Sequence, residues 1–303
     1  MMRLILLGMI MVLAFSYADA QYYRFKNYYE PDLLFEFGAG AGTLHALTDL
    51  GGRKGKGSSF IKDFNPGFAR PVFSLYFLFF YRNSIGLRFE FSSGSIYAAD
   101  KILAAHAAST FGRFDCNLSC STMIRELLLG AEFHPVSKNH DPGADPPAFS
   151  PYLVAAAGYL FFEPRGKWNG NWYSLHPLRT EGQGFAEYPG RKMYSLAQPN
   201  FALGTGLRWR ISEKIISRIE VIHRSLKTDY LDDVSTTYIN ADLFAKYLDQ
   251  QSAYMARNLH SRKNERDPSA ITREGDQRGN PGNRDSYFSI MIRLGFMPLR
   301  GLK

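Results

Sequence analysis

The chain has 303 residues and a formal net charge of +8, and 45% of its residues are hydrophobic. Its lysines and arginines are interspersed with acidic residues, which excludes the basic stripe typical of a nucleic-acid-binding protein. After the first twenty residues no stretch approaches 18 consecutive apolar residues, so no transmembrane helix is predicted. A soluble protein and a transmembrane β-barrel both remain open, because closed barrels also satisfy their backbones in lipid.

Residues 1–20, MMRLILLGMIMVLAFSYADA, have the three parts of a secretory signal peptide. Arg3 provides a basic start, an apolar run follows, and Ala18 and Ala20 are small residues at the cleavage-site positions. The apolar run is shorter than the roughly 20 residues that a membrane span needs. The alternative is a buried N-terminal helix. We predict a signal peptide over residues 1–20 and an exported domain over residues 21–303.

Eight segments of about 10–14 residues in the exported domain have apolar side chains at every second residue, as barrel strands do, and the second of them is apolar on both faces. Ile85, Leu87 and Phe89, for example, alternate with Arg88 and Glu90. In chain order the segments are Leu33–Leu44, Phe68–Tyr81, Ile85–Tyr97, Ser121–His134, Phe149–Phe162, Asn200–Ile211, residues 214–229 and Tyr287–Phe296.

The connections between these segments alternate in length. Two are tight, Arg82–Ser84 and Ser212–Lys214, and residues 135–148 form a medium one. The long connections include residues 98–120, 164–197 and 228–284. Outer-membrane barrels have short periplasmic turns, long external loops and an even strand number. We therefore predict an all-β fold, an eight-stranded antiparallel up-and-down transmembrane β-barrel with long external loops, in the cell outer membrane.

The less apolar faces of the segments collect most of their charges. An arginine turned to lipid near the midplane would cost roughly 2–4 kcal/mol, so these faces are predicted to point inward. An eight-stranded barrel has an interior just wide enough for side chains to fill. The predicted lumen network consists of Glu36, Glu90, Glu126 and Glu220 paired with Arg88, Arg208, Arg218 and Arg293, with Glu132, Arg210 and Arg224 on the same faces.

Cys116 and Cys120 are the two cysteines of the chain, and they are separated by three residues. A local disulfide closing an external loop is the favoured interpretation for an exported protein. A free pair is the alternative. A metal site would need further ligands, and only His106 lies nearby in sequence.

Candidates for chemistry are few, and no cofactor is expected. His223 and Ser225 share the outward face of residues 214–229, where a lipid acyl hydrolase could act, but no nucleophile motif surrounds Ser225. A polar role at the membrane interface is the alternative. Asp229, Asp232 and Asp233 could suggest a cation site, yet their spacing lacks the glycine and terminal glutamate of a calcium loop.

The connection of residues 228–284 is well beyond usual loop lengths. Within it, residues 240–261 carry apolar side chains at helical spacing, with Asp242 near the start as a possible cap. We predict a short amphipathic helix outside the barrel, either a lid on its rim or a partner-binding element. Residues 262–284 are rich in polar residues and glycine, and we expect them to be mobile.

Two stretches, at the start and at the end of this long connection, resemble a known protein family. TDYLDDVSTTYIN, residues 228–240, and RGNPGNRDSYF, residues 278–288, resemble paired signatures of the PorG-like barrel subunit of the Bacteroidetes type IX secretion system. DLLFEFGAGAG, residues 32–42, is similar to the first strand of that family. The resemblance covers nearly the whole mature chain.

The resemblance implies a non-enzymatic outer-membrane subunit for protein secretion and gliding motility. Members of this family associate with a periplasmic ring of PorK and PorN proteins and are thought to tether that ring to the outer membrane. The expected partners are therefore PorK/PorN-like ring proteins and outer-membrane lipid. The alternative function is a small lipid-modifying barrel enzyme or a stand-alone surface barrel.

The mature N-terminus offers a surface for such a partner. Its sequence, QYYRFKNYYEPD, is rich in the residue types that dominate binding hot spots. The two tight turns are too small for a specific interface, which buries on the order of 1,000 Å² in total. The candidate contact residues are Tyr22, Tyr23, Phe25, Tyr28 and Tyr29, and the alternative is an interfacial aromatic belt.

Overall fold

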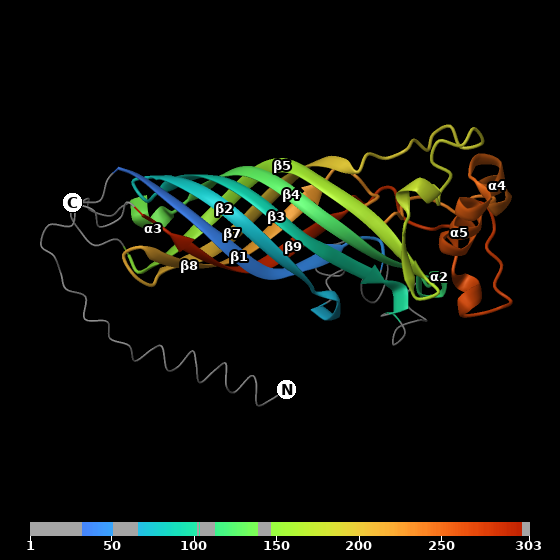
Figure 1. The fold of residues 1–303 in the computed structure, drawn as a ribbon, viewed down its shortest axis with the longest axis horizontal. Helices are drawn as coiled ribbons and strands as arrows, with labels where there is room; N and C mark the ends of the chain where they lie inside the picture. The colour runs from blue at the N-terminus through green and yellow to red at the C-terminus, as the bar shows by residue number, and fades with distance from the viewer. Residues whose placement is uncertain (1–31, 51–65, 102, 104–112, 139–146, 299–303) are drawn as a thin grey trace, which may run out of the picture.

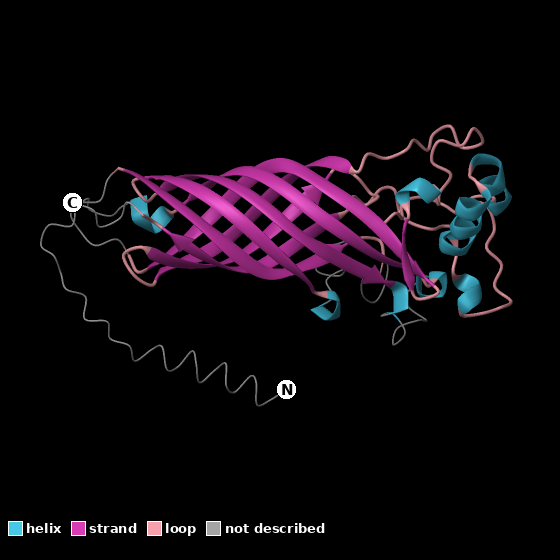
Figure 2. Cartoon of the chain, viewed as in Figure 1, coloured by secondary structure: helices cyan, strands magenta, loops and turns pink. Residues whose placement is uncertain are grey.

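The computed structural model describes residues 32–50, 66–101, 103, 113–138 and 147–298. The predicted signal peptide and the candidate contact residues Tyr22, Tyr23, Phe25, Tyr28 and Tyr29 lie outside these ranges. Within them, the chain forms an elongated barrel with helices and loops gathered at one end (Figures 1 and 2).

Eight strands form one closed antiparallel sheet, as the sequence predicts. Their order is β4-β3-β2-β1-β9-β8-β7-β5, and β4 pairs with β5 to close the barrel. The strands are β1 (Leu33–Leu47), β2 (Arg70–Tyr81), β3 (Ile85–Ala99), β4 (Ser119–Phe133), β5 (Phe149–Trp168), β7 (Ala197–Arg210), β8 (Ile215–Leu226) and β9 (Ser286–Phe296). Every predicted segment corresponds to one of these strands.

A short additional strand, β6 (Asn171–Ser174), pairs with the end of β5. The turn between them is Asn169-Gly170, and both residues have positive φ. Asn-Gly is the preferred pair for such a hairpin turn because both positions need the left-handed region. The sequence prediction treated residues 164–197 as one loop and was wrong here, although the Asn-Gly signal was present.

The alternation of side chains sorts charge from lipid-facing surface. On β8, Arg218 and Glu220 are each 1% exposed, whereas Ile219 is 50% exposed. Most of the exposed side chains in the middle of the other strands are likewise apolar, for example Phe77 on β2 and Leu129 on β4. This belt of apolar side chains around a polar interior is the inverse of a soluble barrel and identifies a membrane-spanning one.

The two ends of the barrel differ. At the turn end, residues 82–84 join β2 to β3 and residues 211–214 join β7 to β8, and β1 begins and β9 ends there. The short helix α3 (Pro135–Lys138) also lies at this end. At the loop end, the long connections fold into a cap that covers the barrel mouth (Figure 1).

Apart from α3, the helices of the described residues lie at the loop end, and the helix predicted over residues 240–261 is shorter than expected. The loop-end helices are η1 (Pro66–Phe68), α2 (Arg113–Cys116), η3 (His176–Leu178), η4 (Ala241–Leu243), α4 (Phe244–Tyr247), α5 (Gln250–His260) and η5 (Lys263–Glu265). The predicted helix over residues 240–261 is interrupted at Leu248 and Asp249, which are extended, because the Asp249 side chain caps α5. Asp242 is not a cap, since Asn240 accepts the backbone N–H of Asp242 instead.

Candidate functional site

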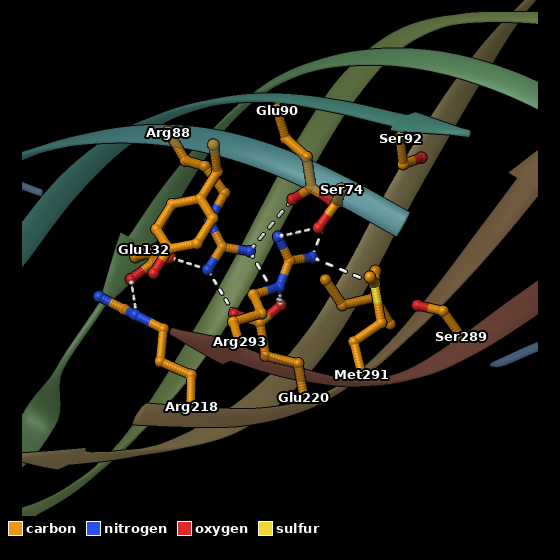
Figure 3. Close-up of polar contacts among 12 residues, drawn as sticks. Ser74, Arg88, Glu90, Ser92, Glu132, Arg218, Glu220, Ser289, Met291 and Arg293 are labelled. Atoms are coloured by element: carbon orange, nitrogen blue, oxygen red, sulfur yellow. Dashed lines mark hydrogen bonds and ion pairs between the residues drawn. The ribbon is translucent and has the colours of Figure 1, made fainter. Parts of the chain in front are cut away.

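The lumen of the turn-end half holds a continuous network of buried ion pairs (Figure 3). Arg218 on β8 donates to both oxygens of Glu36 on β1, each at 2.8 Å, and to Glu132 on β4 at 3.0 Å. Arg88 on β3 pairs with Glu132 and with Glu220, so the network continues around the barrel wall. All of these side chains are at most 2% exposed.

Arg293 on β9 closes this network. Its guanidinium lies 2.7 Å from Glu90 Oε1 and 2.8 Å from Glu220 Oε2, and it donates to Ser74 at 3.2 Å. Arg88 also reaches Glu90, at 3.4 Å. Each arginine therefore touches at least two carboxylates, which compensates for removing these charges from water.

A second polar centre lies nearer the barrel mouth. Glu126 on β4 accepts from Arg224 at 3.2 Å, from the Tyr287 hydroxyl at 2.8 Å and from the side chain of Asn200. Arg224 also donates to Ser289, at 2.6 Å. The predicted pairing omitted Arg224, although its inward parity on β8 marked it as a lumen residue.

The structure places all eight predicted network residues inside the barrel. Arg208 has neighbours at the turn end. It donates to Asn83 at 3.3 Å and to the sulfur of Met297 at 3.3 Å, and its guanidinium lies over the Phe80 ring. These partners lie at the turn end, so Arg208 helps to seal the barrel floor.

Two tyrosines and two glycines complete the packing of the network. Tyr76 donates to Glu36 at 2.6 Å, and Tyr152 donates to Glu220. A Cβ atom at Gly206 would lie 2.4 Å from the Tyr152 ring, and one at Gly295 would lie 2.2 Å from the carboxylate of Glu36. Only glycine fits at these close approaches. These buried, paired side chains fill the lumen of the turn-end half, as expected for an eight-stranded barrel.

The cap is organised around a buried carboxylate, Glu181. It accepts the backbone N–H groups of Ser235, at 2.9 Å, and of Thr236, at 3.0 Å, and it pairs with Arg278 at 2.9 Å. Arg278 also donates to the backbone carbonyl of Asp233. Three separate parts of the sequence thus meet at one point. Sequence reasoning missed Glu181 and Arg278, because both lie in polar loops without a periodic signal.

Residues 262–284, predicted to be mobile, are folded against the rest of the cap. Arg278 is 7% exposed, and Gln277 forms a β-bridge with Thr237. Arg262 donates to Ser119 at the start of β4, at 2.9 Å. The polar composition of this segment serves hydrogen bonding within the cap rather than disorder.

A group of buried acids lies where the cap meets the mouth. Burial is the main cause that raises the pKa of Asp229 to about 9, and the nearby Asp49 and Asp232 contribute to this rise. Burial and then Asp49 raise the pKa of Asp232 to about 7. Burial, Asp232 and Asp229 raise the pKa of Asp285 well above its ordinary range. Asp229 and Asp285 therefore favour the protonated form in the folded cap near neutral pH, and Asp232 titrates in that range.

Two of the three aspartates considered for a cation site accept hydrogen bonds from protein groups. The part of the chain that the structure describes holds no group of three or more histidine, cysteine or acidic side chains arranged to bind a metal ion. Of the sequence candidates, Asp233 is turned away to other partners, Thr180 and the Tyr194 hydroxyl. Asp232 accepts the backbone N–H groups of Leu50 and Val234.

The structure does not show the predicted disulfide between Cys116 and Cys120, and both side chains are buried thiols. Cys116 ends α2 beside the Tyr238 hydroxyl, and burial raises the pKa of its thiol. Cys120 lies on β4, where its sulfur is 3.4 Å from the Thr122 hydroxyl. The chain reverses at Asn117, which has positive φ, and each thiol is directed to a different partner.

His223 and Ser225 occupy successive outward positions of β8. Leu203 and Phe288 pair with His223 across the two neighbouring strands, and Ser286 pairs with Ser225. No carboxylate occupies these paired positions. Among the described residues no helix is both long and apolar enough to cross a membrane.

No family model matches the chain, and no curated protein matches it. Solved structures share its general form at low similarity. Neisserial surface protein A matches with a TM-score of 0.37 and 9% identity, covering 86% of this chain and 96% of that chain. Ail, the attachment invasion locus protein of Yersinia pestis, has a TM-score of 0.35 and 9% identity, covering 88% and 97%. Outer Membrane Protein W of E. coli has a TM-score of 0.32 and 12% identity, covering 87% and 97%.

The assignment of the chain follows from its own geometry. Its sheet closes on itself with eight strands, its outer surface is apolar along the strands, and its charges are paired inside. The chain is an eight-stranded β-barrel protein of the outer membrane.

Proposed function

We propose that this barrel is a non-enzymatic component of the type IX secretion system, which associates with a periplasmic ring of PorK/PorN-like proteins and tethers it to the outer membrane. The proposal rests on the resemblance of residues 228–240 and 278–288 to the paired signatures of the PorG-like family. A lumen filled with side chains is consistent with a structural role.

One observation carries the proposal furthest: the two resembling stretches are parts of a single buried unit. The backbone N–H groups of Arg278 and Gly279 donate to the carbonyl of Thr236, at 3.0 and 2.9 Å. The backbone N–H of Leu231 donates to the Asp285 side chain at 2.8 Å. Stretches that form one packing unit are expected to be kept together within a family, so the paired resemblance has a physical basis.

The ring would be met at the turn end, which we assign to the periplasm because its connections are short. β1 begins at this end, and residues 21–31 precede it in the sequence. We propose that Tyr22, Tyr23, Phe25, Tyr28 and Tyr29 contact the ring or its lipoprotein, helped by residues 135–148.

A pull-down tests the role. The tagged protein, solubilised in detergent from outer membranes of its own host, should bring down the ring proteins in stable proportion. Replacement of the five N-terminal aromatic residues with serine should abolish this co-purification and secretion. A control with Tyr254→Ser and Ile271→Ser, both exposed on the cap, should behave as the wild type.

Two results would contradict the proposal at different levels. If the serine variant inserts normally and retains the ring, the contact assignment is wrong but the role stands. If the wild-type protein brings down no ring protein, the secretion role itself is wrong and the stand-alone barrel becomes the better interpretation.

A further inference from the structure

Cations and aromatic rings gather on the outer wall of the barrel near its loop end. The guanidinium of Arg70 lies 4.7 Å from the centre of the Tyr97 ring, and the ammonium of Lys101 lies 5.9 Å from it. Lys167 lies 5.9 Å from the ring of Trp172. The Tyr97 and Trp172 rings meet edge to face with centroids 6.2 Å apart, so three cations surround one aromatic pair.

This rim cluster, Arg70, Tyr97, Lys101, Lys167 and Trp172, faces outward rather than into the lumen. Arg70, Lys101 and Lys167 are exposed, and Trp172 is 40% exposed. Tyr97 continues the outward row of β3 that begins with the apolar side chains of the membrane belt. The cluster therefore lies above the apolar belt, at the level where lipid headgroups meet the protein.

The charge of this surface is one-sided. Arg125 and Arg165 occupy outward positions on β4 and β5 beside the cluster. The carboxylate on this wall is Glu163, and Arg165 and Ser174 hydrogen-bond to it. Among the described residues, no ion pair engages Arg70, Lys101 or Lys167. Their charges are held in place by ring faces, which leaves their N–H groups available to an anion.

We propose that the rim cluster is a binding site for the phosphate groups of outer-leaflet lipid. Lysine and arginine stems cover apolar surface while their charged heads reach the headgroup level, and aromatic rings at the interface keep them there. A membrane lipid is the source of the phosphate because the cluster stands directly over the lipid-facing belt. The inference is independent of the proposed secretion role.

The test uses the full mature barrel in nanodiscs that contain either a phosphorylated lipid A or the same lipid without its phosphates. Lipid retained by the protein after transfer to detergent is measured by native mass spectrometry. Each cation near an anionic surface strengthens binding roughly fivefold, so the combined variant Arg70→Gln, Lys101→Gln and Lys167→Gln should retain about a hundredfold less phosphorylated lipid. Retention of the lipid without phosphates should be low and unchanged.

Matched variants separate a built site from general charge. Lys192→Gln, Arg273→Gln and Arg284→Gln remove the same charge from exposed cap positions and should leave retention unchanged. Tyr97→Leu removes no charge but releases Arg70 and Lys101, and should weaken retention about tenfold. An equal loss of retained lipid in the cap control would overturn the site. Wild-type retention in the rim variant would also overturn it, provided that the heat-modifiable band shift shows normal folding. Inorganic phosphate at millimolar concentration should not compete; competition would assign the cluster to free phosphate instead.

Discussion

The lumen and the cap both bury charged side chains, but they balance them differently. In the lumen, five buried glutamates meet five buried arginines: Glu36, Glu90, Glu126, Glu132 and Glu220 with Arg88, Arg208, Arg218, Arg224 and Arg293. In the described part of the cap, the buried acids outnumber the buried arginines. The buried acids are Asp100, Glu181, Asp229, Asp232, Asp233 and Asp285, and the buried arginine is Arg278.

The two regions stabilise their buried acids in different ways. Lumen carboxylates are paired with arginines that cannot lose their charge, so the lumen network is expected to be insensitive to pH near neutrality. In the cap, Asp232 accepts backbone N–H groups, and burial raises the pKa values of Asp229 and Asp232, which favours their neutral forms. The lumen is therefore a permanent part of the barrel, whereas the acidic side of the cap should respond to pH.

The largest effect is expected in the lumen, at Arg218. Arg218→Leu leaves Glu36 and Glu132 without their shared partner, and breaking such a buried pair costs about 3–5 kcal/mol. Urea unfolding in lipid vesicles, followed by the band shift on unheated gels, should show a lower midpoint. The control Ile219→Leu changes the adjacent outward position and should be neutral. Equal unfolding midpoints for the two variants would mean that the inward and outward faces of β8 contribute equally to stability.

A smaller and more local effect is expected in the cap, at Arg278. Arg278→Met removes the partner of Glu181 and should cost about 1.5–3 kcal/mol, since hydrogen bonds to charged groups are worth this much. Limited proteolysis should cut residues 228–284 faster while the barrel keeps its band shift. Arg257→Met, which removes an exposed ion pair with Asp242, is the control and should not accelerate cleavage. Loss of the barrel band shift in Arg278→Met would show that the two regions unfold together.

The third effect concerns pH and Asp229. Its pKa is about 9 in the folded cap and about 4 in an unfolded chain, so the folded cap binds the extra proton between these values. Stability is then fully present below pH 4 and falls as the pH rises toward 9. Asp229→Asn should stabilise the cap at pH 8 by on the order of 1 kcal/mol, discounted for solvent screening, and little at pH 4.

Hydrogen exchange of the cap at pH 5 and at pH 8 measures this effect. The wild-type cap should exchange with higher protection at pH 5 than at pH 8 after correction for the intrinsic rate, and the variant should lose most of that difference. The barrel strands serve as the internal control, because their protection should not follow the pH. An unchanged pH difference in Asp229→Asn would assign it to another buried acid, such as Asp285.

The smallest effect is expected at the cysteines. Since Cys116 and Cys120 are not joined by a disulfide in the structure, a reductant should leave the unfolding midpoint of the cap unchanged. Alkylation of the unfolded, unreduced protein should add two labels by mass spectrometry. A mass that shows no label before reduction and two after it would demonstrate the disulfide that the sequence suggested.

The sequence by itself determined the barrel and its inside-out charge. Strand side chains alternate with a period of two, so the parity of Ile219 against Arg218 and Glu220 is readable from residues that are neighbours in the chain. The alternation also marked Glu132 and Arg224 as lumen residues. The Asn169-Gly170 turn was readable for the same local reason, although the prediction did not use it.

Only the tertiary structure decided which charges meet. Arg218 and Glu36 are 182 residues apart, and Arg88 and Glu220 are 132 apart, so their contact depends on how the sheet closes and staggers. The contacts within the cap were even less predictable from the sequence, because Glu181, Thr236 and Arg278 come from loops with no periodic pattern. Periodicity reports which face a side chain occupies, but the partner across a lumen or within a cap is set by strand register and loop packing, which no local pattern encodes.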